Sequence, residues 1–147
     1  MLAGLDHRFL QQTSDPELTD VAYDTRKLTP GCAFVCIRGA KLDSHALAAQ
    51  AAEQGAAALI VEHAVDAPAD IPVVQVADTR IALAEMAANF FGHPAKQLKT
   101  VGITGTKGKT TTTYLLKAIL EEAGYKTGLI GSIGALIGTE PVKTINT

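Results

Sequence analysis

The chain has 147 residues, of which 47% are apolar and 19% are charged, and its net charge is −2 at pH 7. This composition predicts a globular protein with a hydrophobic core and excludes a disordered chain. The small negative charge and the few aromatic residues give no basis for binding nucleic acid or an anionic membrane surface. No apolar run approaches the ~20 residues of a membrane span, and Asp6, His7 and Arg8 interrupt any signal-peptide core.

Apolar runs and turn residues alternate along the first two thirds of the chain and predict an α/β domain with a mostly parallel sheet. Residues 33–37 form a continuous apolar run, typical of a central strand that is buried on both faces. Ser44 and Asp78 occupy N-cap positions, and Gly55 and Gly92 follow the two helices that they would start. We expect strands at residues 18–23, 33–37, 57–61 and 73–76, and helices at residues 45–54 and 79–91.

The second of these helices carries a broad apolar stripe that is suited to covering a sheet. The stripe consists of Ile81, Leu83, Ala84, Ala87, Ala88, Phe90 and Phe91.

The two cysteines, Cys32 and Cys36, alternate onto one face of the central strand. We expect both to be small core residues and not metal ligands, because no second pair accompanies them. Unpaired thiols fit a reducing compartment, so we expect a cytoplasmic protein. The four histidines are scattered without the spacing of metal ligands: His7, His45, His63 and His93.

Residues 100–111 have the order strand, glycine-bearing turn, helix that a phosphate-binding loop requires. We expect a buried strand at residues 100–104, followed by a helix with Leu115, Leu116, Ile119, Leu120 and Ala123 on its apolar side. Gly105 and Gly108 would turn backbone N–H groups towards an anion, where the positive end of the helix dipole adds to the attraction. Lys109 would reach the β- and γ-phosphates of ATP, and the Thr110 hydroxyl would bind Mg²⁺.

The strict phosphate-loop spacing fails in one place, because Ile103 stands where a glycine is usual. The alternative interpretation is a Gly/Thr-rich turn that caps an ordinary helix. We favour a nucleotide site, and the expected ATP-binding residues are Gly105, Thr106, Lys107, Gly108, Lys109, Thr110 and Thr111.

A short polar connection at residues 95–98 predicts a domain boundary, with one domain at residues 1–95 and a second at 96–147. The second domain lacks the later acidic strand that would hold Mg²⁺. Either the chain is a piece of a longer polypeptide or the nucleotide site is incomplete, and we favour the first interpretation.

The loop resembles the Thr-Gly-Thr-Asn-Gly-Lys-Thr-Thr signature of the Mur ligases, which build the peptide stem of peptidoglycan, with Lys107 at the asparagine. The first domain is also similar to this family. Its Asp24-Thr25-Arg26 and its residues 30–35 resemble the Asp-Ser-Arg and Pro-Gly-Asp-Leu-Phe-Val patterns, and Asp43-Ser44-His45 resembles Asp-Gly-His. Residues 144–147 are similar to the Thr-x-Asn-Thr-Thr segment of the member that acts on the muramoyl-dipeptide.

The resemblance implies an N-terminal α/β domain of the Mur-ligase type, followed by the start of an ATP-binding central domain. It implies an ATP- and Mg²⁺-dependent ligase that adds a third amino acid to UDP-N-acetylmuramoyl-L-Ala-D-Glu through an acyl phosphate. The residues that it assigns to this substrate are Tyr23, Thr25, Ala40, Lys41 and Leu42 in the first domain, and Asn146 and Thr147 at the end of the chain.

Several alternatives remain open at this point. The parent enzyme could instead be the family member that adds D-Ala-D-Ala, or the chain could be a nucleotide-binding module without catalysis. Asp24 and Arg26 could pair only to fix a turn, His45 could lie at a helix start without touching uridine, and Lys41 could be a solvated loop charge. We expect a monomer that does not ligate as these 147 residues alone.

Overall fold

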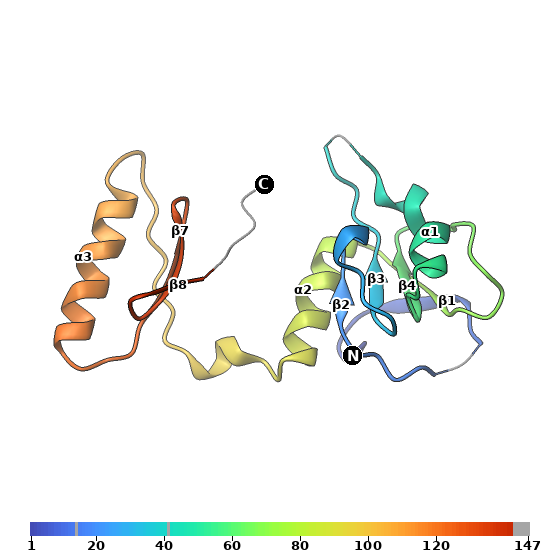
Figure 1. The fold of residues 1–147 in the computed structure, drawn as a ribbon, viewed down its shortest axis with the longest axis horizontal. Helices are drawn as coiled ribbons and strands as arrows, with labels where there is room; N and C mark the ends of the chain where they lie inside the picture. Colours follow the sequence, from blue (N-terminus) through green and yellow to red (C-terminus); the bar gives the residue numbers. More distant parts are fainter. Residues whose placement is uncertain (14, 41, 143–147) are drawn as a thin grey trace. The chain divides into compact units, whose positions relative to one another are not determined.

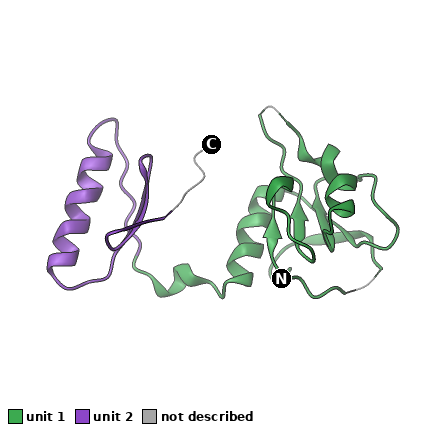
Figure 2. Ribbon diagram, in the orientation of Figure 1, with its two compact units in different colours: residues 1–99 green, residues 100–147 purple. Residues whose placement is uncertain are grey.

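The computed structural model describes residues 1–13, 15–40 and 42–142. The chain divides into two compact units, Met1–Lys99 and Thr100–Thr147 (Figure 2). The boundary expected from the sequence lies slightly earlier, within the short 3₁₀ helix η3 (Pro94–Gln97). The roles assigned to the two domains remain a prediction. No helix in the described part of the chain is long and apolar enough to cross a membrane.

The first unit is built on a five-stranded sheet with the order β1-β5-β4-β3-β2. Strands β2 to β5 are parallel to one another. Strand β1 lies at the edge of the sheet and pairs antiparallel with β5. The predicted mostly parallel sheet is therefore confirmed, although the strand expected at residues 18–23 is reduced to two residues. The strands are β1 (His7–Gln11), β2 (Val21–Ala22), β3 (Ala33–Val35), β4 (Ala58–Val61) and β5 (Val73–Val76).

Two helices cover opposite faces of this sheet, α1 (Ala48–Glu53) on one side and α2 (Thr79–Phe90) on the other (Figure 1). Successive residues of a strand point to opposite faces of the sheet and so belong to different cores. Phe34 and Leu59 pack in the α1 core, whereas Val35 packs in the α2 core. The central strand is thus buried on both faces, as the apolar run at residues 33–37 predicted.

The two cysteines belong to the core on the α1 side, and both are fully buried, as expected. Burial raises the pKa of the Cys36 thiol to about 12, so this thiol stays protonated and unreactive at neutral pH.

The first helical segment begins differently from the prediction. Asp43, and not Ser44, is the N-cap, because its carboxylate accepts from the backbone N–H of His45 at 3.0 Å. It starts the 3₁₀ helix η2 (Ser44–Leu47), which leads into α1. Ser44 instead exchanges hydrogen bonds with the backbone N–H and carbonyl of Ile37.

Helix α2 begins at the predicted cap, where the Asp78 carboxylate accepts from the N–H groups of Arg80 and Ile81. The predicted apolar stripe is wrong for most of its residues: Leu83 packs against the core on this side, but Ile81 is 61% exposed and Phe91 is 66% exposed. The buried residues of the helix are Thr79, Ala82 and Met86. These buried residues recur at three- and four-residue intervals, so they form the narrow face that meets the sheet.

The second unit contains helix α3 (Lys109–Glu122) and a three-stranded antiparallel sheet. Its strands are β6 (Gly128–Gly131), β7 (Gly134–Ile137) and β8 (Glu140–Val142). The strand expected at residues 100–104 is not formed, and Val101 is 67% exposed. A strand needs a neighbour for its backbone hydrogen bonds, and none of the described strands pairs with this segment.

The apolar side predicted for α3 is only partly packed. Leu115 and Ile119 are more than 60% exposed, while Lys117 is buried beside Glu121. The described residues of this unit therefore show the helix that follows a phosphate loop, without the parallel sheet of a phosphate-loop domain.

Candidate functional site

The loop before α3 has the backbone geometry that an anion site needs. Gly105 has φ +150° and Gly108 has φ +77°, the latter as the left-handed N-cap of the helix. A side chain at Gly108 would be strained by this φ, although nothing lies within 4 Å of a Cβ there. The first i→i−4 hydrogen bond of α3 runs from Thr112 N–H to Gly108 O, so the preceding amides lie at the open end of the helix.

Two side chains supply a cation and a hydroxyl group at this open helix end. Lys109 folds back over the loop, where its Nζ donates to the carbonyl of Gly105 at 2.6 Å. Thr110 lies exposed in the first helical turn. All seven residues predicted to bind ATP lie on this loop and turn, which combine N–H donors, a lysine cation and hydroxyl groups.

A divalent cation would find few protein ligands here. The described residues contain no group of three His, Cys, Asp or Glu side chains that could hold a metal. The Thr110 hydroxyl supplies one oxygen, which suits Mg²⁺, because this ion is usually held by phosphate oxygens and water with one or two protein ligands. The residues present therefore fit Mg²⁺ that arrives with a nucleotide.

In the first unit, the loops that follow the parallel strands meet at the carboxyl edge of the sheet. Tyr23 and Thr25 follow β2, and Ala40 and Leu42 follow the neighbouring strand β3. Tyr23 is 56% exposed and Leu42 is 59% exposed, so both leave apolar surface uncovered at this edge. Open α/β sheets bind ligands at this edge. The other predicted substrate residues, Lys41, Asn146 and Thr147, lie outside the described residues.

Asp24 and Arg26 form an ion pair that fixes the turn after β2. The Arg26 Nη2 lies 2.7 Å from Asp24 Oδ2, and Arg26 Nε and its backbone N–H both donate to Asp24 Oδ1 at 3.0 Å. The hydrogen bond from the Arg26 side chain is the main cause that lowers the pKa of Asp24 to about 2. Asp24 also caps the 3₁₀ helix η1 (Thr25–Lys27), so the pair orders the backbone that carries Thr25.

His45 lies at a helix start, within η2, and its ring is buried. The structure also identifies Glu62 and Arg38 as its neighbours in a polar cluster, and neither residue was expected from the sequence. The sequence feature that could have indicated this cluster is the Asp43-x-His45 spacing at the end of a loop.

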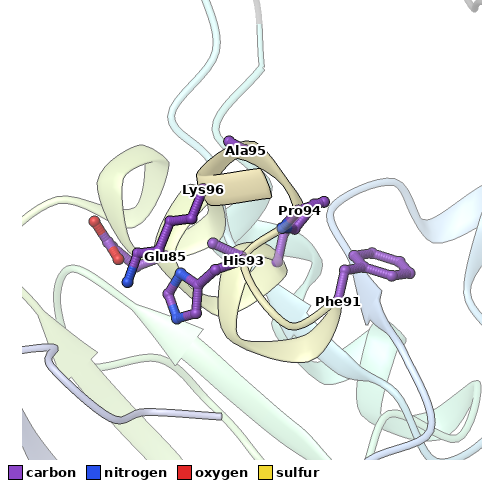
Figure 3. A pocket seen from close by; sticks show the side chains of 8 residues that line it. Glu85, Phe91, His93, Pro94, Ala95 and Lys96 are labelled. Carbon is purple, nitrogen blue, oxygen red and sulfur yellow. The ribbon is translucent and has the colours of Figure 1, made fainter. Parts of the chain in front are cut away.

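A shallow hollow lies between the end of α2 and η3, lined by residues that include Glu85, Phe91, His93 and Lys96 (Figure 3). It contains none of the residues predicted to bind nucleotide or UDP, and it is not part of the candidate site.

The sequence matches two parts of one family. Residues 17–91 match the Mur ligase family, catalytic domain, and residues 103–147 match the Mur ligase middle domain. The chain therefore belongs to the Mur ligase family, as its phosphate loop and Asp24-Thr25-Arg26 predicted.

The similar proteins include ligases for two different steps. UDP-N-acetylmuramoyl-L-alanyl-D-glutamate–2,6-diaminopimelate ligase from Clostridium perfringens is 44% identical over 147 residues, 100% of this chain and 30% of the relative. MurF from Acinetobacter baumannii is 35% identical, with a TM-score of 0.61 over 84% of this chain and 26% of its own. MurF from Thermotoga maritima, solved in complex with ADP, is 26% identical, with a TM-score of 0.53 over 70% of this chain and 23% of its own. The chain thus spans about 30% of the length of its curated relative.

Proposed function

We propose that this chain is the N-terminal part of an ATP-dependent amide ligase that adds the third amino acid to UDP-N-acetylmuramoyl-L-Ala-D-Glu. One observation carries the proposal: the 44% identity to a 2,6-diaminopimelate ligase runs along the whole chain and includes both candidate sites. The added amino acid would be diaminopimelate or lysine.

The first unit would hold the UDP end of the substrate at the carboxyl edge of its sheet. Tyr23 and Leu42 offer exposed apolar surface for the uracil ring, and the Thr25 hydroxyl can both donate and accept a hydrogen bond. Lys41 would lie on the same loop, and Asn146 and Thr147 would contact the muramoyl-peptide. Binding energy from the remote UDP group would keep the reacting carboxylate in place.

The second unit would bind ATP at the loop before α3. The γ-phosphoryl group would pass to the D-glutamate carboxylate, giving an acyl phosphate and ADP. The incoming amine would attack the acyl carbon, forming the amide bond and releasing inorganic phosphate. Lys109 and the loop N–H groups would stabilise the phosphate charge, while Mg²⁺ on Thr110 would neutralise more of it.

The ligase that adds D-Ala-D-Ala is the second candidate, supported by the likeness to MurF from Acinetobacter baumannii. The two ligases differ in the peptide that they extend, so the preferred substrate separates them: muramoyl-dipeptide for the first and muramoyl-tripeptide for the second. A nucleotide-binding module without catalysis is the third candidate, since the described residues contain no cluster of metal-binding side chains.

A monomeric enzyme in the cytoplasm is part of the same proposal. The buried thiols of Cys32 and Cys36 are not joined in a disulfide, which fits a reducing compartment, where ATP is also available.

Calorimetric titration of the chain with UDP-N-acetylmuramoyl-L-Ala-D-Glu, with UDP and with Mg-ATP tests the proposal. We expect saturable binding of both UDP compounds, weakened about tenfold or more by Thr25→Phe, because a bulky ring would fill the substrate position. Thr29→Phe is the matched control, since residue 29 precedes β3 and so lies at the opposite edge of the sheet. Binding of ATP without either UDP compound would show that the first unit has another role.

A further inference from the structure

His45 connects two loops at the carboxyl edge of the first unit's sheet. Its Nδ1 lies 2.5 Å from Asp43 Oδ1, and its Nε2 lies 2.9 Å from the backbone N of Glu62, just after β4. Because a backbone N–H can only donate, Nε2 must accept, and the proton of the neutral ring must be on Nδ1, facing the carboxylate. The buried ring thus joins the loop after β3 to the loop after β4.

Glu62 extends this connection to the loop after β5. One oxygen of its carboxylate accepts from both the backbone N–H and the hydroxyl of Thr79, at 3.1 and 2.9 Å. The Arg80 guanidinium then donates to the carbonyl of Arg38, whose own guanidinium lies 3.6 Å from Asp43. The contacts form a closed circuit around three consecutive loops.

The segment held by this circuit is the loop after β3, described at residues 37–40 and 42–44, which carries Ala40 and Leu42. Ser44 closes its base through hydrogen bonds with the backbone of Ile37, and Gly39 N–H bonds to Leu42 O at 2.9 Å. A Cβ at Gly39 would lie 2.8 Å from that carbonyl, so the turn leaves no room for a side chain there. The base of the loop is ordered, while Ala40 and Leu42 stay exposed.

We propose that His45 is a positioning residue that, through Asp43 and Glu62, holds residues 37–40 and 42–44 in the conformation that receives the UDP group of the substrate. The inference rests on the proposed function for the identity of the ligand. It assigns a role to a buried side chain that presents no polar atom to the ligand, because both ring nitrogens already have partners.

The connection depends on Nε2 as the acceptor for the Glu62 N–H and on Nδ1 as the donor to Asp43. The charged and titratable groups around the ring are Asp43, the Glu62 carboxylate, the Arg38 guanidinium beside Asp43, and His63, whose ring centroid is 4.3 Å away. Loss of the acceptor at Nε2 should therefore loosen the loop and weaken binding.

The test compares the 147-residue chain with two variants by calorimetry with UDP-N-acetylmuramoyl-L-Ala-D-Glu at pH 8. His45→Gln keeps an acceptor for Glu62 N–H and a donor for Asp43, so its affinity should stay within about threefold of the wild type. His45→Phe removes both hydrogen bonds and should bind about tenfold more weakly.

Hydrogen exchange of the Gly39, Ser44 and Glu62 amides, followed by NMR without ligand, gives a second readout. At the same pH, these amides should exchange faster in His45→Phe than in the wild type and in His45→Gln, while the β3 and β5 amides stay protected and report an intact fold. His7→Gln, on the exposed edge strand β1, is the control for another histidine and should change neither affinity nor exchange.

If the wild type binds the ligand and His45→Phe binds it equally well, or if His45→Gln binds as weakly as His45→Phe, the inference is wrong and the proposed function stands. If the wild type does not bind, the proposed function is wrong. In that case, unchanged exchange in His45→Phe overturns the positioning role too, whereas faster exchange supports His45 as the residue that orders this loop.

Discussion

The pair formed by Asp24 and Arg26 makes the turn after β2 sensitive to acid. Asp24 has a pKa of about 2, below its usual 3.8, because Arg26 donates side-chain and backbone hydrogen bonds to it. A group with a lowered folded pKa stabilises the structure above its unfolded pKa, and that contribution is lost as the pH falls through the folded value. The ordering of Thr25 should therefore be complete above pH 3.8 and lost between pH 3.8 and about 2.

The pKa of Asp24 can be measured directly by NMR of its carboxyl carbon as the pH is changed. Arg26→Gln should move its titration towards 3.8, and Lys27→Gln, which removes only a minor charge effect, should move it much less. Equal shifts in the two variants would contradict the assignment of the lowered pKa to the hydrogen bonds of Arg26.

The two lysines of the phosphate loop allow a matched comparison. Lys109 already lies over the loop, with its Nζ on Gly105 O, whereas Lys107 is an exposed side chain on the turn. We expect Lys109→Ala to weaken Mg-ATP binding about tenfold or more, since a charge-assisted hydrogen bond contributes ~1.5–3 kcal/mol. Lys107→Ala should weaken it less than about threefold, as expected for a solvated charge.

The binding can be followed by NMR through the amides of Gly105 and Gly108 as Mg-ATP is added, which also detects weak affinity. Equal losses in the two variants would mean that only the net charge of the loop matters, and that Lys109 does not contact the phosphates.

At the level of the secondary structure, helix α2 depends on the cap at its first turn. The Asp78 carboxylate accepts from the N–H groups of Arg80 and Ile81, at 2.8 and 3.1 Å. Asp78→Ala should lower the free energy of unfolding of the first unit by about 1 kcal/mol. Urea titration followed on the β3 and β4 amides measures this, and Asp66→Ala, in the exposed loop before β5, should change it by less than about 0.5 kcal/mol.

Helix α3 illustrates how much of an element is specified locally. Its start at Lys109 follows from Gly108 and the motif residues around it, and a helix was expected directly after this glycine-bearing turn. Its apolar side depends on what packs against it, and in the described structure Leu115 and Ile119 remain exposed. Local chemistry therefore determines where the helix begins, while its burial depends on neighbours far along the chain.

For the whole molecule, we expect that these 147 residues bind ligands but do not form the amide bond. The curated relative is more than three times longer, since this chain covers 30% of it, and the described residues contain no metal-binding cluster. A ligation assay with ATP, UDP-N-acetylmuramoyl-L-Ala-D-Glu and diaminopimelate should detect no product above background, with the Clostridium perfringens ligase as the positive control. Amide formation by this chain would show that its two units contain a complete catalytic site.

The sequence by itself determined the features that depend on neighbouring residues: the glycine loop before α3, the Asp78 cap, and the buried strands β3, β4 and β5. Only the tertiary structure decided the features that depend on distant partners. Strand β1 mixes polar residues with Phe9 and Leu10, is mostly exposed, and exists through backbone pairing with β5. Residues 100–104 have a strand-like sequence but no described partner. The circuit through His45 and Glu62 arises because parallel strands bring the loops that follow them to one edge, which no local pattern in the sequence reveals.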